Sequence, residues 1–101
     1  MYIVTTTFTR PSTDVLFYMD AHPEIRNRFN SFVTAQTGKN LITMSATKND
    51  LQQIVVAVYE SEEALNQLLV EQEEAFPGLF NDRDKYCLDN NITVTREVEQ
   101  L

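Results

Sequence analysis

The chain has 101 residues, of which 43% are hydrophobic and 23% charged, and a formal net charge of -7. This size and composition predict a single domain over residues 1–101 and exclude a disordered or disulfide-dependent chain. The acidic balance argues against nucleic acid as a partner, because phosphate binding needs a basic surface, and no apolar run approaches the roughly 20 residues that span a membrane.

The first predicted element is a strand over 2–9, where β-branched and aromatic residues are frequent and alternate. Pro11 ends it because proline has no N–H group to donate to a sheet. The next stretch, 12–22, leaves two alternatives open. Residues 12–14 could cap a short helix, or 15–18 could run extended across the domain.

A helix is predicted over 23–36. Pro23 suits the first helical position, the apolar residues that follow form one helical stripe, and Gly38 supplies a left-handed stop. Two strands are expected next, over 40–47 and 51–59. The polar residues between them make a turn of hairpin length.

A second helix is predicted after Ser61, whose side chain can cap it, and the two glutamates that follow meet the positive end of the helix dipole. Pro77 and Gly78 end this helix. Residues 79–89 look like a polar loop anchored by a few apolar side chains. Residues 91–99 form the last predicted strand.

The predicted order is therefore β-α-β-β-α-β, which is the ferredoxin-like α+β arrangement. It gives a four-stranded antiparallel sheet with two helices on one face. The strands over 2–9 and 51–59 are expected at the centre of the sheet, and the strand over 91–99 at an edge.

Both faces of the predicted strand 51–59 are apolar. Ile54, Val56 and Val58 lie on one face, and Val55, Ala57 and Tyr59 on the other. A strand with one side in water should alternate apolar with polar residues, so both faces are expected to be buried. We expect a homodimer packed sheet to sheet. The alternative is that residues 14–21 or 79–88 fold over the second face.

The junction of this strand with the second helix, Val58–Leu65, reads V-Y-E-S-E-E-A-L. With the element order, it resembles the dimeric α/β-barrel superfamily and its antibiotic-biosynthesis-monooxygenase-like family, in which an aromatic residue commonly ends the third strand before a serine-capped acidic helix. The resemblance implies the fold, a homodimer and cofactor-free monooxygenase or isomerase chemistry. Haem-degrading members use a tryptophan and a ligating histidine. This chain has no tryptophan, and Asn66 and Gln67 stand where some relatives place a histidine.

Candidate site residues gather in the irregular connection before the first predicted helix. In this fold the connection would lie beside a cleft between that helix and the sheet, where apolar ligand pockets form. The ligand-binding candidates are Arg10, Asp14, Phe17, Tyr18 and His22. His22 and Tyr18 are also the catalytic candidates, because a histidine titrates near neutral pH and both groups can carry protons. The alternative is that the apolar residues complete the core and Arg10 pairs with Asp14 at the surface.

The other reactive groups of the chain do not form the pattern of a known catalytic or metal site. A nucleophile pair could form only from His22 and Cys87, against the alternative of a packed cysteine and a helix-capping histidine. Residues 82–93 lack the glycine and final glutamate of a calcium loop, and two glycines cannot build a phosphate-binding loop. One histidine and one cysteine cannot form a closed zinc site. We expect no metal and no cofactor.

The negative charge is concentrated in residues 51–101, which contain eleven acidic and three basic residues. Glu71, Glu73 and Glu74 are expected to form part of a solvated helix face. Cys87 is the only cysteine, and the chain starts without a signal-peptide pattern, so a reducing cytoplasm is the expected location.

These observations predict a small acidic homodimer, without a nucleic-acid or membrane partner, that acts as a non-catalytic binding or interaction module. A small apolar ligand is a possible partner. The alternative is a cofactor-free enzyme of monooxygenase or isomerase type, with a pocket between the first helix and the sheet.

Overall fold

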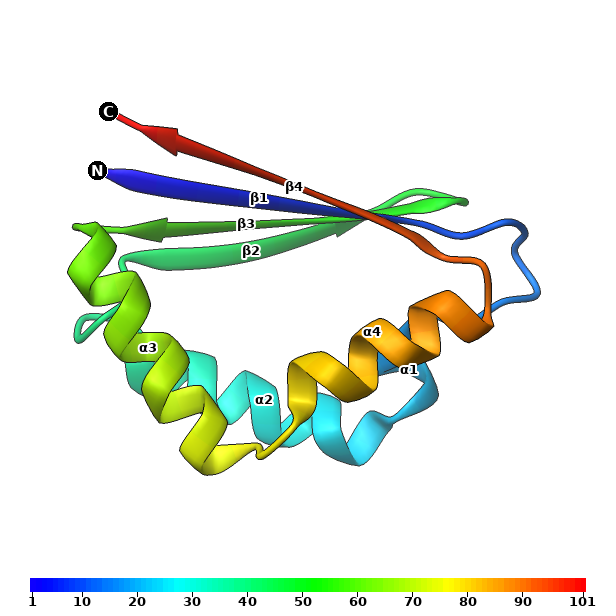
Figure 1. Ribbon diagram of the computed structural model, residues 1–101, viewed down its shortest axis with the longest axis horizontal. Helices are drawn as coiled ribbons and strands as arrows, with labels where there is room; N and C mark the ends of the chain where they lie inside the picture. The colour runs from blue at the N-terminus through cyan, green and yellow to red at the C-terminus, as the bar shows by residue number, and fades with distance from the viewer.

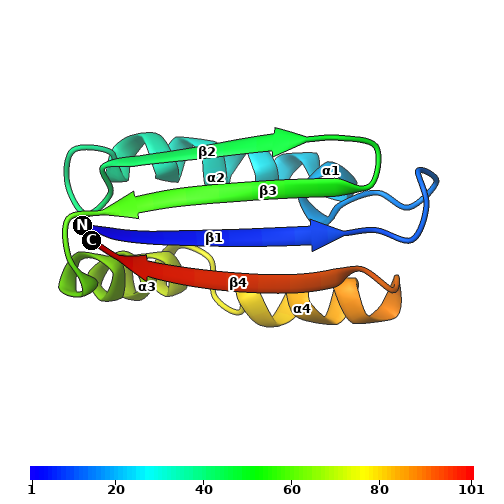
Figure 2. The ribbon, with the colours of Figure 1, turned by 90° about the horizontal axis from the view of Figure 1, so that it is seen from above.

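A computed structural model describes all of residues 1–101. Its elements are β1 (Tyr2–Thr9), α1 (Tyr18–Ala21), α2 (Pro23–Gln36), β2 (Thr43–Lys48), β3 (Gln52–Tyr59), α3 (Glu62–Ala75), α4 (Leu79–Asp89) and β4 (Thr93–Gln100). The four strands form one sheet in the order β2-β3-β1-β4, and every neighbouring pair is antiparallel (Figure 2). None of the helices has the length and apolar character needed to cross a membrane.

The domain has two layers, because all four helices lie on the same side of the sheet (Figure 1). The ferredoxin-like α+β fold predicted from the sequence is confirmed, with β1 and β3 central and β4 at an edge. Both α1 and α4 are on the side that α2 and α3 occupy. The alternative in which residues 14–21 or 79–88 fold over the second face is therefore wrong.

Neither alternative for the connection after β1 is correct. Residues 12–14 lie in turns and cap no helix, while α1 is a four-residue helix that begins only at Tyr18. Phe17 precedes it in extended conformation and makes no capping hydrogen bond. Pro23 then begins α2 at the predicted residue.

The predicted loop over 79–89 is also wrong, because these residues form α4. The side chains of Leu79 and Cys87 are buried at a spacing of eight residues, close to two helical turns. Of the polar run between them, Asn81, Asp82, Asp84 and Lys85 are exposed, whereas Arg83 lies against the Phe8 ring on the sheet side. Gly78, with a φ of 74°, makes the left-handed turn that separates α4 from α3.

Buried residues form three clusters between the sheet and the helices. The first cluster joins α3 to the sheet and contains Val4, Leu41, Ala57, Tyr59, Leu65 and Leu68. Phe8, Phe17, Cys87 and Ile92 form the cluster beside α4. The last cluster, between the helices, contains Tyr18, Phe76 and Leu79. Together they cover one face of the sheet only.

The opposite side of the sheet, here called the open face, carries no helix (Figure 1). Its central residues are the pairs Ile3–Val58, Thr5–Val56 and Thr7–Ile54 of β1 and β3. Threonine and serine line β2, and β4 adds Glu97 and Glu99 at the other edge. The predicted placement of Ile54, Val56 and Val58 away from the buried Ala57 and Tyr59 is confirmed.

Candidate functional site

Arg10 closes the connection between β1 and α1 onto the turn between β2 and β3. Its Nε donates to the carbonyl oxygen of Asp50 at 2.8 Å, and its Nη1 donates to that of Val15 at 2.9 Å. The guanidinium carbon also lies 4.9 Å from the centre of the Phe17 ring. Arg10 therefore acts as a clamp on the backbone of this connection.

Asp14 takes no part in this arrangement. Its side chain is exposed and belongs to none of the ion pairs in the structure. The predicted surface pair between Arg10 and Asp14 is therefore wrong. The arginine instead satisfies backbone carbonyl groups that no regular element would pair.

Three rings form an aromatic cluster near the end of α1, from α1, from α4 and from the residue between α1 and α2. The ring centres of Tyr18 and His22 are 4.5 Å apart. Tyr86, from α4, lies edge-on at 5.6 Å from Tyr18 and 5.8 Å from His22. The Tyr86 hydroxyl donates to the carbonyl oxygen of Leu16 at 2.7 Å, which ties α4 to the segment before α1.

The hydrogen bond of His22 determines which ring nitrogen can act as a base. Its Nδ1 lies 2.8 Å from the carbonyl oxygen of Tyr18. A carbonyl oxygen only accepts hydrogen bonds, so Nδ1 must carry the proton. In the neutral ring Nε2 then keeps a free lone pair. The half-buried imidazole is held in the tautomer that a general base requires.

Tyr18 supplies a hydroxyl that stays protonated at neutral pH. Burial raises the pKa of Tyr18 above its ordinary value, and the negative charge of Asp82 raises it further. The phenol can donate a hydrogen bond, but it is a poor source of phenolate. Within the aromatic cluster, His22 can therefore accept a proton and Tyr18 can donate a hydrogen bond.

Cys87 belongs to the buried cluster of Phe8, Phe17 and Ile92. Burial raises the pKa of its thiol, which disfavours the nucleophilic thiolate. No hydrogen bond joins it to His22, whose ring hydrogen bond goes to Tyr18. The packed cysteine is the alternative that the structure shows.

The structure thus joins the predicted residues in two pairs, Tyr18 with His22 and Arg10 with Phe17. Tyr86 is not among the predicted site residues, because the sequence pattern over 79–89 predicts a loop. Its position seven residues after the buried Leu79, close to two helical turns, was the signal that could have placed it.

A separate polar cluster joins the end of α2 to α3. The carboxylate of Glu71 accepts hydrogen bonds from four side chains, those of Gln36, Lys39, Asn40 and Gln67, at distances from 2.5 to 3.4 Å. The bonds from Lys39 and Gln36 lower its pKa. Glu71 is therefore part of a network, and the predicted solvated face retains only Glu73 and Glu74.

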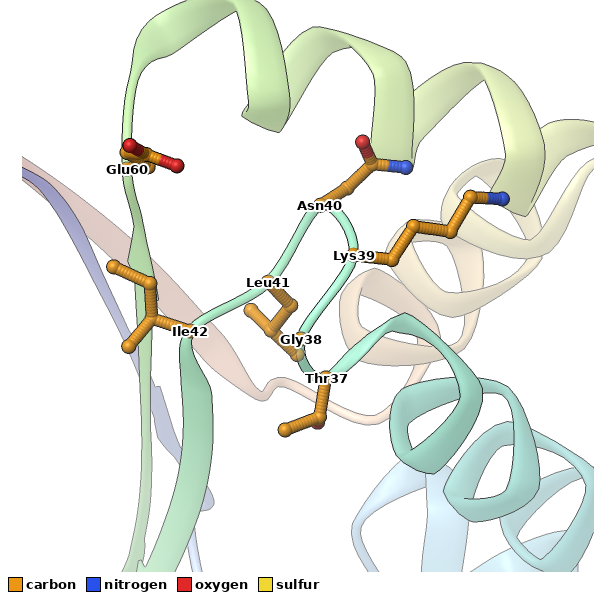
Figure 3. A pocket seen from close by; sticks show the side chains of 7 residues that line it. All are labelled: Thr37, Gly38, Lys39, Asn40, Leu41, Ile42 and Glu60. Carbon is orange, nitrogen blue, oxygen red and sulfur yellow. The ribbon is translucent and has the colours of Figure 1, made fainter.

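Two shallow hollows lie away from the aromatic cluster. The first, of about 340 Å³, is lined by residues 37–42 and Glu60 and opens to solvent between the start of β2 and α3 (Figure 3). The second lies at the turn between β2 and β3. Neither is lined by Tyr18 or His22. No three histidine, cysteine, aspartate or glutamate side chains gather as a metal site would require.

No family model matches the chain, and no curated protein matches it in sequence. Its fold, in contrast, matches several solved structures over nearly its whole length. One is a dimeric ferredoxin-like protein from an uncultured marine organism, with a TM-score of 0.62 and 8% identity over 99% of this chain and 93% of that one.

Two others are described as enzymes. A Deinococcus radiodurans protein, provisionally described as an antibiotic biosynthesis monooxygenase, gives a TM-score of 0.59 at 11% identity over 100% of this chain and 92% of that one. SnoaB, a cofactor-independent oxygenase from Streptomyces nogalater, gives 0.56 at 14% identity over 99% and 91%. The chain therefore shares the fold expected from its resemblance to the antibiotic-biosynthesis-monooxygenase-like proteins.

Proposed function

We propose that the chain acts as a homodimeric, non-catalytic binding module whose two copies join through the open face. The observation that carries this proposal is the position of all four helices on one side of the sheet, which leaves Ile3, Ile54, Val56 and Val58 without a cover. A contiguous apolar stripe at the centre of a sheet is a typical self-association surface. The solved dimeric ferredoxin-like protein with this fold supports a second copy of the chain as the partner at this face.

The size of the open face suits a moderate affinity. A strand of eight residues extends about 26 Å, and four strands span about 19 Å, so the face covers roughly 500 Å² in projection. Stable interfaces bury about 800 Å² on each partner. Projecting side chains make the accessible surface larger than its projection, which reduces the gap between about 500 and about 800 Å² without closing it. A dissociation constant in the micromolar range is therefore expected, and dilution should separate the copies.

Sedimentation velocity over a dilution series tests the assembly. At 100 µM the protein should sediment with twice the 11.7 kDa mass of one chain, and it should dissociate towards the low micromolar range. Val56→Glu places a charge at the centre of the stripe and should give a folded monomer at every concentration. A wild-type monomer at 100 µM would overturn the proposal.

The matched control is Val70→Glu, which makes the same substitution on α3 at a side chain that is 53% exposed. This variant should remain a dimer. If it dissociates as readily as Val56→Glu, added charge alone explains the loss, and the open face is not the interface. Far-ultraviolet circular dichroism of both variants verifies that each keeps its helices and strands.

A second candidate is a cofactor-free enzyme of oxygenase or isomerase type, with His22 as base and Tyr18 as hydrogen-bond donor. The bond from His22 Nδ1 to the Tyr18 carbonyl favours it, because it leaves Nε2 free to accept a proton. The fold shared with a cofactor-independent oxygenase adds support. Substrate would have to enter between the segment before α2 and the sheet.

Oxygen uptake with electron-rich phenols, without added metal or cofactor, tests this candidate. Uptake should vanish in His22→Ala and persist in Glu24→Gln, a change at an exposed neighbour on α2. Uptake that survives His22→Ala would remove His22 from the chemistry. A protein inactive on the whole panel would leave the binding module as the better explanation.

A further inference from the structure

The side chains of the open face lie in rows that cross the sheet. Each row takes one residue from β2, β3, β1 and β4, in that order. The first row contains Thr43, Val58, Ile3 and Glu99. The second contains Ser45, Val56, Thr5 and Glu97, and the third contains Thr47, Ile54, Thr7 and Thr95. A fourth row, beyond the end of β2, contains Gln52, Thr9 and Thr93. The apolar side chains therefore lie in the middle of the first three rows, and both edges are polar.

The two edges of the open face carry complementary hydrogen-bonding groups. On β4, the first two rows end in the carboxylates of Glu99 and Glu97, which are exposed and belong to no ion pair. On β2, the same two rows end in the exposed hydroxyl groups of Thr43 and Ser45. No lysine, arginine or histidine stands in any of the rows. Hydroxyl groups are therefore the only side-chain donors that the first two rows offer to these carboxylates.

One chain cannot bring its own edges together. β2 and β4 lie on opposite sides of the sheet (Figure 2), three strand spacings or about 14 Å apart. A hydrogen bond between a hydroxyl and a carboxylate needs an oxygen–oxygen distance of about 2.5 to 3.0 Å. A second copy packed on the open face can supply the missing edge.

A two-fold axis can relate two aligned sheets in either of two ways. With the axis parallel to the strands, β2 of one copy faces β4 of the other, β3 faces β1, and each row meets its own copy. With the axis perpendicular to the strands and in the plane of the sheet, every strand faces its own copy and the order of the rows is reversed. The two arrangements therefore differ in which edges and which rows meet.

The distribution of apolar and charged side chains favours the parallel axis. It places Val58 over Ile3 of the partner subunit, so apolar surface meets apolar surface. It also places Glu97 and Glu99 over the uncharged edge of the partner. With the perpendicular axis the first row would meet the polar fourth row, and all four glutamates would lie between two facing β4 strands, where like charges repel.

We infer that the two-fold axis of the dimer is parallel to the strands, so that the Ser45 hydroxyl donates to the carboxylate of the partner's Glu97, and the Thr43 hydroxyl to that of the partner's Glu99. The inference rests on the proposed homodimer and adds the orientation of its second copy. Each contact occurs twice in the dimer. A partner without hydroxyl groups at this edge would leave the carboxylates unpaired, so the contacts select a second copy of this chain.

A charge added to either edge tests the orientation by sedimentation velocity over the same dilution series. Ser45→Lys should lower the dissociation constant about ten-fold, because it forms an ion pair with the partner's Glu97 twice in each dimer. In the Glu97→Gln background this gain should fall below about two-fold. The matched control Thr93→Lys adds the same charge to the other edge and should change the dissociation constant less than about three-fold. Equal or greater tightening in Thr93→Lys would overturn the inference, as would a gain in Ser45→Lys that survives Glu97→Gln.

Cysteine cross-linking measures the same contact directly. Ser45→Cys/Glu97→Cys should form covalent dimers with a dithiol reagent about 5 Å long, because facing side chains bridge most of the roughly 10 Å between packed sheets. Wild type, whose one cysteine is buried, and Glu97→Cys alone should form few. Covalent dimer in Glu97→Cys equal to that in the double variant would show β4 facing itself. A wild type that is monomeric at 100 µM overturns the homodimer as well, whereas a dimer that fails these charge and cross-linking tests overturns the orientation alone.

Discussion

The two faces of the sheet are built from alternate residues of the same strands, yet their side chains are buried to different extents. On the helix side, Val4, Ala57 and Tyr59 are all less than 9% exposed. On the open face their chain neighbours Ile3, Val56 and Val58 are only half-buried, screened by adjacent strands. β3 is apolar on both of its faces, so the difference in burial along this strand comes from the connections between strands, which place every helix on one side.

The largest loss of stability is expected on the side of the sheet that the helices cover. Leu68→Ala on α3 removes a side chain that is 2% exposed and should lower the free energy of unfolding by about 2 to 5 kcal/mol. The exposed Val70→Ala on the same helix should change it by less than about 0.5 kcal/mol. Urea denaturation measures both variants. Similar losses would mean that α3 is not held through the face that packs on the sheet.

The open face should respond to mutation in a way that depends on concentration. Val56→Thr replaces a methyl group with a hydroxyl of similar shape. In a dimer two copies of this change meet at the interface, and a cost of about 2 kcal/mol raises the dissociation constant roughly 30-fold. The same variant should unfold at nearly the wild-type urea concentration when both are dilute. Equal sedimentation of wild type and variant would contradict the role of the open face.

A smaller effect is expected where α3 begins. The Ser61 hydroxyl accepts a hydrogen bond from the Ala64 amide at 3.2 Å. Ser61→Ala should destabilise the protein by about 1 kcal/mol, while Ser61→Asp should retain most of the wild-type stability because aspartate is also a good cap. Thermal unfolding followed by circular dichroism compares them. A loss of stability in Ser61→Asp equal to that in Ser61→Ala would show that capping is not the source.

The smallest effect should appear only in the pH dependence of stability. The pKa of Glu71 is lowered in the folded chain, so its hydrogen-bond network stabilises the fold above about pH 4.3, the ordinary pKa of glutamate. This contribution is lost at lower pH as the carboxylate is protonated. Glu71→Gln should be less stable than wild type at pH 7, and the difference should shrink towards pH 3. A difference that is constant over this range would rule out the ionic contribution.

Much of the fold could be predicted from the sequence, since alternation and capping are local signals. β1 and α2 occupy the residues expected, and Ser61 caps α3 as predicted. The error at 79–89 arose because five consecutive polar residues hid an apolar spacing close to two helical turns. Patterns read over a short window favour the polar run, although the helix needs only one buried stripe.

The candidate site was less accessible from the sequence. Tyr18 and His22 are four residues apart, so their contact follows from one helical turn. The approach of Tyr86 depends on how α4 packs, and the Arg10 clamp depends on carbonyl groups that have no side-chain signature. The Tyr86–Leu16 bond and the Arg10–Asp50 bond join residues far apart in sequence, and the hydrogen bond that sets the His22 tautomer goes to backbone.

The position of β1 between β3 and β4 has a consequence for how the chain acquires its structure. Thr9 pairs with Gln52 on one side and with Thr93 on the other, so only the hairpin of β2 and β3 is local. Domains dominated by distant pairings fold slowly. At synthesis rates of roughly 5 to 20 residues per second, β1 waits about 4 to 17 s for β4 to be made. During that interval one edge of a threonine-rich central strand has no hydrogen-bonding neighbour. Such an edge can pair with another chain, so its protection during synthesis depends on chaperones.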